Sequence, residues 1–214
     1  MARQHTHIEL RRIGLTLQSR GRHPASRAPP LMSNVNHHMT FSVRAAKPEE
    51  AEAACCAVRA SIEVCCAEDH GGEGARLDAW LKNKTPETFR TWIQSDKLYS
   101  VVVEESSRIV GFGMSAPGEV LLCYVAPEVR FRGAGKAVLQ ALELWAAISG
   151  VPELRLESTR TALAFYRRNG FKRCGPVVTF AGMEGHPMSK PIMAKPPIEG
   201  MSCGKPQATP HVKR

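Results

Sequence analysis

Residues 124–137, which read YVAPEVRFRGAGKA, decide the fold that we expect for this chain. They end a nearly continuous apolar segment, 119–125, which predicts a central strand buried on both faces. A short loop rich in arginine and glycine follows, and a helix is expected over 133–149. Because the first N–H groups of a helix are unpaired and glycine lets a ligand come close, this order predicts a phosphate-binding loop. Nearby positive charge comes from Arg130, Arg132 and Lys136.

The spacing of this loop separates it from two common phosphate loops. GxxxxGK[ST] is absent, and there is no GxGxxG early in a βαβ unit. The chain instead has Arg-x-x-Gly-x-Gly from Arg130 to Gly135, after Val125-x-Pro127. This pattern resembles the pyrophosphate loop, motif A, of the GNAT N-acetyltransferase superfamily. Downstream, residues 162–171, ALAFYRRNGF, are similar to the A-x-x-F-Y-x-x-x-G-F segment of that family.

The resemblance covers residues 40–195 and implies an α/β (α+β) fold. The expected sheet is mixed, mostly antiparallel and six- to seven-stranded, with a central parallel pair splayed for CoA and helices on both faces. We expect strands at 41–44, 99–103, 108–114, 119–125, 154–157, 171–179 and 188–194. Helices are expected at 48–66, 75–83, 86–95, 133–149 and 159–169, with a polar loop at 68–72.

The resemblance also implies a site. Acetyl-CoA would lie between the strands at 119–126 and 153–158, with backbone amides of 131–136 on its pyrophosphate. An amide near Cys123 to Val125 would hold the thioester oxygen. Tyr166 matches the general acid of the family, and a phenol is protonated at neutral pH. The implied cofactor-binding residues are Tyr124, Val125, Arg130, Phe131, Arg132, Gly133, Ala134, Gly135, Lys136, Thr159, Ala162 and Phe165.

Thr159 departs from the family pattern, because many members carry Asn seven residues before the tyrosine. A hydroxyl there is expected to change the local contacts with the cofactor. The base is less well marked: Glu119 begins the central strand and would act through a water. Asp69 and His70 lie in a region that often forms the acceptor site in this family. Each of these three is also compatible with a solvated loop residue or a helix cap.

The net charge of +9 does not point to nucleic acid as a partner. Residues 1–38 hold six Arg against Glu9, and residues 199–214 hold three cations against Glu199. The remaining segment carries only +2, so the folded part has little basic excess. The partners that we expect are acetyl-CoA and an amine, which the sequence leaves open as a small amine, an amino acid, an antibiotic or a protein.

The seven cysteines predict reduced thiols rather than disulfides or a metal site. Their number is odd, and four form adjacent pairs at 55–56 and 65–66 in an expected helix, without C-x-x-C spacing. We therefore expect a cytoplasmic protein without a metal. No apolar run approaches the roughly 20 residues that cross a bilayer, so no membrane partner is expected.

The chain divides into three parts. Residues 1–38 are expected to be a disordered basic leader, either a transit peptide or a stretch before the true start at Met32 or Met39. Residues 39–195 form the acetyltransferase domain, and residues 196–214 a flexible tail. Because members of this family often dimerise, the resemblance allows a homodimer.

An N-acetyltransferase is the function that we expect, and a non-catalytic module that senses acyl-CoA is the alternative. Such a module would need the loop at 130–135 but not Tyr166. The presence of Tyr166 therefore favours the enzyme.

Overall fold

The computed structural model describes residues 41–193, and the segments expected to be a leader and a tail lie outside this range. Its first half is β1 (Ser42–Ala45) followed by helices. These are η1 (Pro48–Glu50), α2 (Ala51–Ala60), η2 (Ser61–Cys65), α3 (Ala67–His70), α4 (Gly74–Leu81) and α5 (Pro86–Gln94). The second half holds β2 (Tyr99–Glu105), β3 (Arg108–Ala116), β4 (Glu119–Val125), η3 (Pro127–Val129), α6 (Ala134–Ile148), β5 (Glu153–Ser158), α7 (Leu163–Arg168), β6 (Lys172–Arg173), β7 (Val178–Phe180) and β8 (Met183–Pro191).

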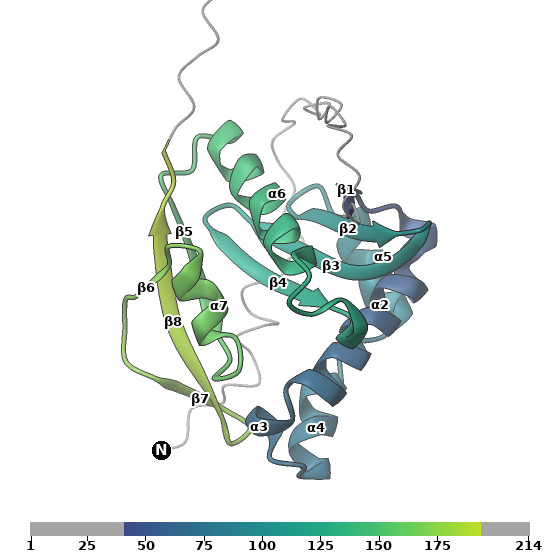
Figure 1. Ribbon diagram of the computed structural model, residues 1–214, viewed down its shortest axis with the longest axis vertical. Coiled ribbons are helices and arrows are strands. Elements are labelled where there is room, and N and C mark those ends of the chain that lie inside the picture. The colour runs from purple at the N-terminus through teal and green to yellow at the C-terminus, as the bar shows by residue number, and fades with distance from the viewer. Residues whose placement is uncertain (1–40, 194–214) are drawn as a thin grey trace, which may run out of the picture.

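The strands form one mixed sheet in the order β1-β2-β3-β4-β5-β8-β6, with β7 paired to β8 (Figure 1). All neighbours are antiparallel except β4 and β5, which are parallel. The expected fold class, with a central parallel pair, is confirmed. Only Glu119 and Arg155 pair across β4 and β5, so the two strands diverge toward their carboxyl ends.

Within the described residues the sheet has eight strands, because the strand expected at 171–179 is divided in two. β6 and β7 are separated by a segment that contains Gly175 and Pro176. Proline has no N–H to give to a strand pair, which explains the break at this point.

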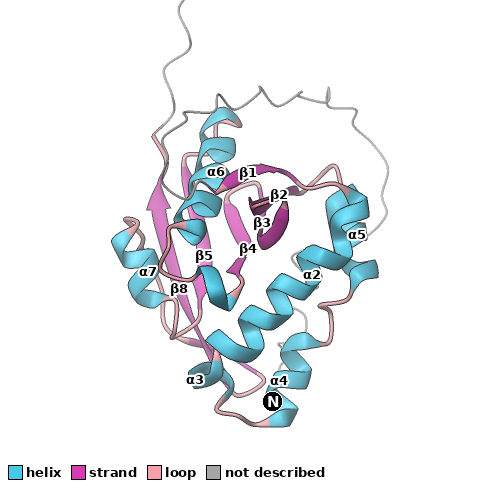
Figure 2. Cartoon of the chain, turned by 45° about the vertical axis from the view of Figure 1, so that its right-hand side comes forward, coloured by secondary structure: helices cyan, strands magenta, loops and turns pink. Residues whose placement is uncertain are grey.

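Helices cover both faces of the sheet, and each face has its own apolar core. On one face α6 packs through Val138, Leu139 and Leu142 against β2, β3 and β4, and α7 adds Tyr166. On the other face α2, α4 and α5 pack through residues such as Val58, Trp80 and Phe89. Figure 2 shows α2 and α5 on the side of the strands away from α6.

The helix expected over 48–66 is interrupted, and it reaches further than expected. A π-helical turn, η2, separates α2 from α3, which ends at His70 instead of giving way to a loop at residue 68. Gly71 ends α3 in the left-handed region, with φ of 61°. Asp69 and His70 are buried here, so tertiary contacts extend the helix through residues whose polarity suggested a loop.

Candidate active site

The divergence of β4 and β5 opens a pocket between their carboxyl ends. Its lining combines both strands with the start of the α7 segment. The register of β3 and β4 shifts between Val120 and Leu122, which leaves Leu121 as an extra, bulged residue on β4. The lining residues are Val120, Leu121, Cys123, Tyr124, Leu156, Glu157, Thr159, Ala162 and Tyr166.

Backbone N–H groups of β4 face this opening. Ala126 donates its N–H to Val110 on β3 at 2.8 Å. Since successive residues of a strand direct their N–H groups to opposite sides, those of Cys123 and Val125 point toward β5. β5 has already diverged at this level, so these two groups are available to a ligand between the strands.

The loop before α6 presents a second set of N–H groups. Gly133 is the N-cap of α6 with φ of 99°, and no side chain caps the helix. The first N–H with a partner in the helix is that of Ala137, which donates to the Gly133 carbonyl at 3.0 Å. Within residues 41–193, the N–H groups of Ala134, Gly135 and Lys136 therefore have no hydrogen-bond acceptor, which is the arrangement of donors that an anion needs.

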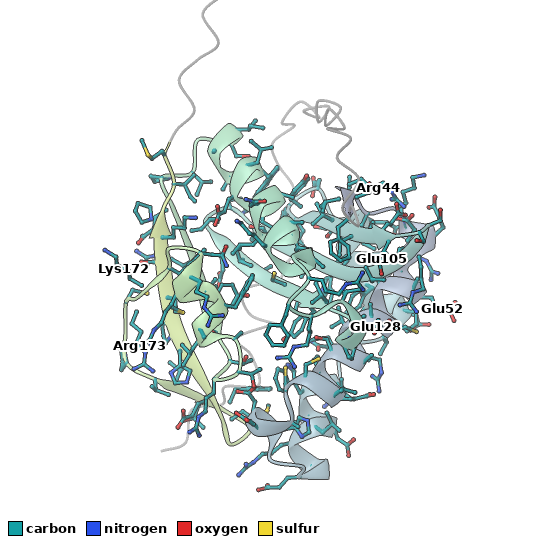
Figure 3. All side chains as sticks on the ribbon, viewed as in Figure 1. Arg44, Glu52, Glu105, Glu128, Lys172 and Arg173 are labelled. Carbon is teal, nitrogen blue, oxygen red and sulfur yellow. The ribbon has the colours of Figure 1, made fainter. Side chains whose placement is uncertain are left out.

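The side chains of this loop differ in their surroundings. Phe131 is 91% exposed and has a left-handed φ of 60°, with the Arg130 guanidinium 4.8 Å from its ring centroid. Arg132 forms an ion pair with Glu105 and donates to the Glu128 carbonyl at 3.3 Å. Figure 3 shows Glu105 and Glu128 on the side of the molecule away from Lys172 and Arg173. The Arg132 guanidinium is therefore bound to Glu105 and Glu128, whereas the Arg130 guanidinium lies over the Phe131 ring.

Tyr166 joins the pocket to the start of α6. Its ring is 7% exposed and packs edge-on against Phe165 and Phe171. Its hydroxyl is hydrogen-bonded to the Cys123 thiol, which in turn donates to the Gly135 carbonyl at 3.9 Å. A carbon added to Gly135 would lie 3.5 Å from the Phe165 ring, so α7 packs closely against α6 here.

Burial keeps both groups of this pair protonated. It raises the pKa of Tyr166 well above its ordinary value of 10, and the neighbouring Cys123 adds to the shift. Burial also raises the pKa of Cys123 to about 12, although the hydrogen bond from Tyr166 acts in the opposite direction. At neutral pH the tyrosine can therefore donate a proton, and the thiol is not an activated nucleophile.

Thr159 and Ala162 lie between β5 and α7, because α7 begins at Leu163 and not at residue 159 as expected. The Thr159 hydroxyl accepts from the Ala162 N–H at 3.2 Å, and Ala162 is the N-cap of α7. The hydroxyl thus shapes the turn that leads from the pocket to Tyr166.

Asp69 and His70 reach the same region from the other half of the chain. Asp69 Oδ1 accepts from the N–H of Arg160 at 2.7 Å and of Thr161 at 3.4 Å. His70 Nδ1 accepts from the Gly72 N–H at 3.2 Å, and its Nε2 lies 3.4 Å from the Glu63 carbonyl. Both residues are buried, but only Asp69 holds backbone groups of the turn between the pocket residues Thr159 and Ala162.

Strand β4 carries Glu119 and strand β5 carries Glu157. Of these two carboxylates, Glu157 lines the pocket and Glu119 does not. Glu119 begins β4 opposite Arg155, where the strands are still paired. Glu157 is an exposed residue of β5, two positions before Thr159. The sequence analysis missed it, although its place just before a motif position was an available signal.

Other features of the described part of the chain concern metals, thiols and membranes. Over residues 41–193, no group of three or more His, Cys, Asp or Glu side chains could hold a metal ion. The six cysteines in this range are free thiols. None of the helices described there is long and apolar enough to cross a membrane.

Comparisons with known proteins agree with this geometry. A family model described as the acetyltransferase (GNAT) domain matches residues 66–192, which is more than half of the chain. A GCN5-related N-acetyltransferase from Rhodopseudomonas palustris has a similar structure, with 24% identity and a TM-score of 0.63 over 72% of this chain and 99% of that one. A comparison with curated proteins found no match.

Two further solved structures share the fold. The PaiA N-acetyltransferase from Thermoplasma acidophilum, crystallised with coenzyme A, is 24% identical, with a TM-score of 0.59 over 72% of this chain and 99% of that one. A GCN5-related N-acetyltransferase from Kribbella flavida is 19% identical, with a TM-score of 0.55 over 71% and 97%. Together with the family model, the sheet and the loop before α6, they lead to one conclusion: this chain belongs to the GNAT acetyltransferase family.

Proposed function

We propose that this protein transfers the acetyl group of acetyl-CoA directly to a primary amine. The observation that carries the proposal is the pocket between β4 and β5, which the buried Tyr166 lines. The same pocket adjoins the start of α6, because the Cys123 thiol is hydrogen-bonded both to the Tyr166 hydroxyl and to the Gly135 carbonyl. The proposed proton donor, Tyr166, is thus linked through Cys123 to Gly135 in the proposed anion site.

The residues present fit acetyl-CoA. The N–H groups of Ala134, Gly135 and Lys136 match a pyrophosphate, with Arg130 and Lys136 supplying charge nearby. Bound acetyl-CoA supplies a thioester that an amine can attack. The N–H groups of Cys123 and Val125 are the donors that would hold its carbonyl oxygen, a contact that strengthens as negative charge develops. Further contacts are proposed for Tyr124, Phe131, Arg132, Gly133, Thr159, Ala162 and Phe165.

Tyr166 is the proposed general acid. It keeps its proton at the hydroxyl because burial raises its pKa, and it gives that proton to the departing thiolate. The amine must lose a proton as well. Glu119 remains a candidate for this task through a water, and Glu157 joins it because it lines the pocket. The acceptor is proposed to enter on the α3 side, where Asp69 and His70 lie.

The test measures thiol release from acetyl-CoA across a panel of amines, with wild type and Tyr166→Phe compared. Loss of a positioned proton donor is expected to lower kcat roughly 100-fold or more, with little change in CoA affinity. Tyr99→Phe is the matched control, because Tyr99 stacks on Trp145 outside the pocket lining. It removes the same hydroxyl and should leave kcat unchanged.

Two results would overturn the proposal. If CoA binds but no amine releases thiol, the protein is an acyl-CoA-binding module. If wild type and Tyr166→Phe have the same kcat with an active amine, Tyr166 is a packing residue and another group is the acid.

A further inference from the structure

Asp69 makes a long-range contact that the proposed reaction does not yet use. Its Oδ1 accepts two consecutive backbone N–H groups, those of Arg160 and Thr161, from a segment 91 and 92 residues away in the chain. The bond to Arg160 is short, at 2.7 Å, and the carboxylate is 9% exposed. A carboxylate that accepts from backbone N–H groups makes a stronger bond than a neutral acceptor would.

The two N–H groups that Asp69 holds belong to the turn that carries the pocket wall. Thr159, immediately before them, and Ala162, immediately after them, both line the pocket. The turn leads directly into α7, since the Tyr166 N–H donates to the Ala162 carbonyl at 3.1 Å. Fixing residues 160 and 161 therefore fixes the start of the segment that places the Tyr166 hydroxyl.

The support for Asp69 is itself well fixed. His70 accepts from the Gly72 N–H through Nδ1, and its Nε2 lies 3.4 Å from the Glu63 carbonyl, so it contacts both the turn after α3 and the π-helical turn before it. α3 also contacts β8, and Figures 1 and 2 both show it at the end of the sheet next to β8. Asp69 is thus part of a short helix that is held by contacts with β8 and η2.

The carboxylate keeps one oxygen without a partner. Among the described residues Asp69 Oδ2 is buried and has no hydrogen-bond partner, and Thr161 Oγ1 is in the same condition. Burying an unsatisfied polar atom is unfavourable for stability. An amide oxygen at this position can also accept the two N–H groups, so an asparagine there should keep most of this contact.

We propose that Asp69 is a positioning residue for acyl transfer, holding the turn between β5 and α7 so that the Tyr166 hydroxyl stays aligned in the pocket. This inference rests on the proposed function, because it assigns Asp69 a part in that reaction. Asp69 does not touch the reacting atoms. It connects the half of the chain before β2 to the half that carries the general acid.

The experiment compares Asp69→Ala, Asp69→Asn and Glu68→Ala in the full chain. Asp69→Ala should lower kcat roughly 10- to 100-fold, the loss expected for hydrogen bonds to a charged group. The Kd for CoA, measured by calorimetry, should change much less than kcat, because most of the proposed contacts to CoA come from the separate loop at 130–136. Asp69→Asn keeps an acceptor oxygen and should recover most of the loss, and Glu68, an exposed neighbour, should have no effect.

A second measurement does not depend on turnover. Amide hydrogen exchange of the segment 159–166 should be faster in Asp69→Ala than in wild type, with 130–140 unchanged. Unchanged exchange at 159–166 overturns the proposal, and so does faster exchange with an unchanged kcat, which would make Asp69 purely structural. If Asp69→Ala does not fold, Asp69→Asn gives the same comparison with a smaller expected loss.

The two proposals fail in different ways. A wild type that binds CoA but acetylates no amine refutes the proposed function, and the exchange data then decide whether Asp69 holds the turn. An active wild type whose kcat is unaffected by Asp69→Ala refutes only the positioning role.

Discussion

Replacing Gly113 with alanine should push β3 away from α6, the helix whose first turn is the proposed anion site. Gly113 lies on β3 opposite Cys123. A carbon added to it would be 2.4 Å from Val138 Cγ1 on α6 and 3.1 Å from Val101 Cγ2 on β2. Both valines are fully buried, so neither can move aside into solvent.

The expected cost follows from this overlap. Adding carbon to a closely packed core destabilises by about 1–3 kcal/mol. For a domain of this size that loss lowers Tm by roughly 3–9 °C. Because α6 carries the loop at 130–136, we also expect weaker binding of CoA. Thermal and urea unfolding measure the first effect, and calorimetry with CoA measures the second.

A double-mutant cycle with Val138→Ala tests the cause. Val138→Ala alone should cost about 1.5 kcal/mol or more, for two buried methyl groups. Combined with Gly113→Ala it removes the clashing atom, so the pair should be more stable than the sum of the single changes by at least about 1 kcal/mol. Gly74→Ala is the control, since nothing lies within 4 Å of the added carbon. Additive losses, or an equal loss for Gly74→Ala, would refute the reasoning.

Three further predictions concern the base, alkaline stability and the loop. If Glu157 takes the proton of the amine, Glu157→Gln should lower kcat at least roughly 10-fold, whereas Glu119→Gln leaves it unchanged; the opposite result would assign the base to Glu119. Burial and the charge of the nearby Asp69 raise the pKa of Cys66 to about 12 from 9.0, so the unfolded chain loses this proton first and stability falls as pH rises from 9 toward 12. The alanine variant of Cys66 should therefore lose about 1.4 kcal/mol less unfolding free energy between pH 7.5 and 10 than wild type, and equal losses in urea titrations would contradict this. Gly133→Ala places a side chain at φ of 99° and should cost about 1–2 kcal/mol by chemical denaturation, while an unchanged midpoint would show that the loop relaxes freely.

The sequence predicted the parts of the fold that depend on local order. Helix α6 begins within one residue of its expected start. The signals for it, Gly133 and the apolar spacing that follows, lie together in one segment of the chain. The cap of α5 follows the same rule: Thr85 accepts from the Thr88 N–H at 3.2 Å. In both cases the residues that decide the structure are neighbours in the chain.

The features that the sequence did not predict depend on contacts between segments that are distant in the chain. The bulge at Leu121 has no marker within EVLLCYV, since it appears only when β4 is paired with β3. Polar residues at 68–70 suggested a loop, yet Asp69 finds its partners in the turn after β5 and stays helical. The position of Glu157 two residues before Thr159 was a signal in the sequence, but its place in the pocket depends on the divergence of β4 and β5.

The same contacts explain why the candidate site needs both halves of the domain. The proposed anion site at α6 is local, because all of its residues lie within one short segment of the chain. The proposed proton donor, Tyr166, depends on distant contacts, because the turn at 159–162 leads into its helix and Asp69 holds that turn from the helices before β2. CoA binding and acetyl transfer should therefore respond separately to mutation. Changes around α3 should lower turnover more than affinity, and changes around Gly133 should lower affinity more than turnover.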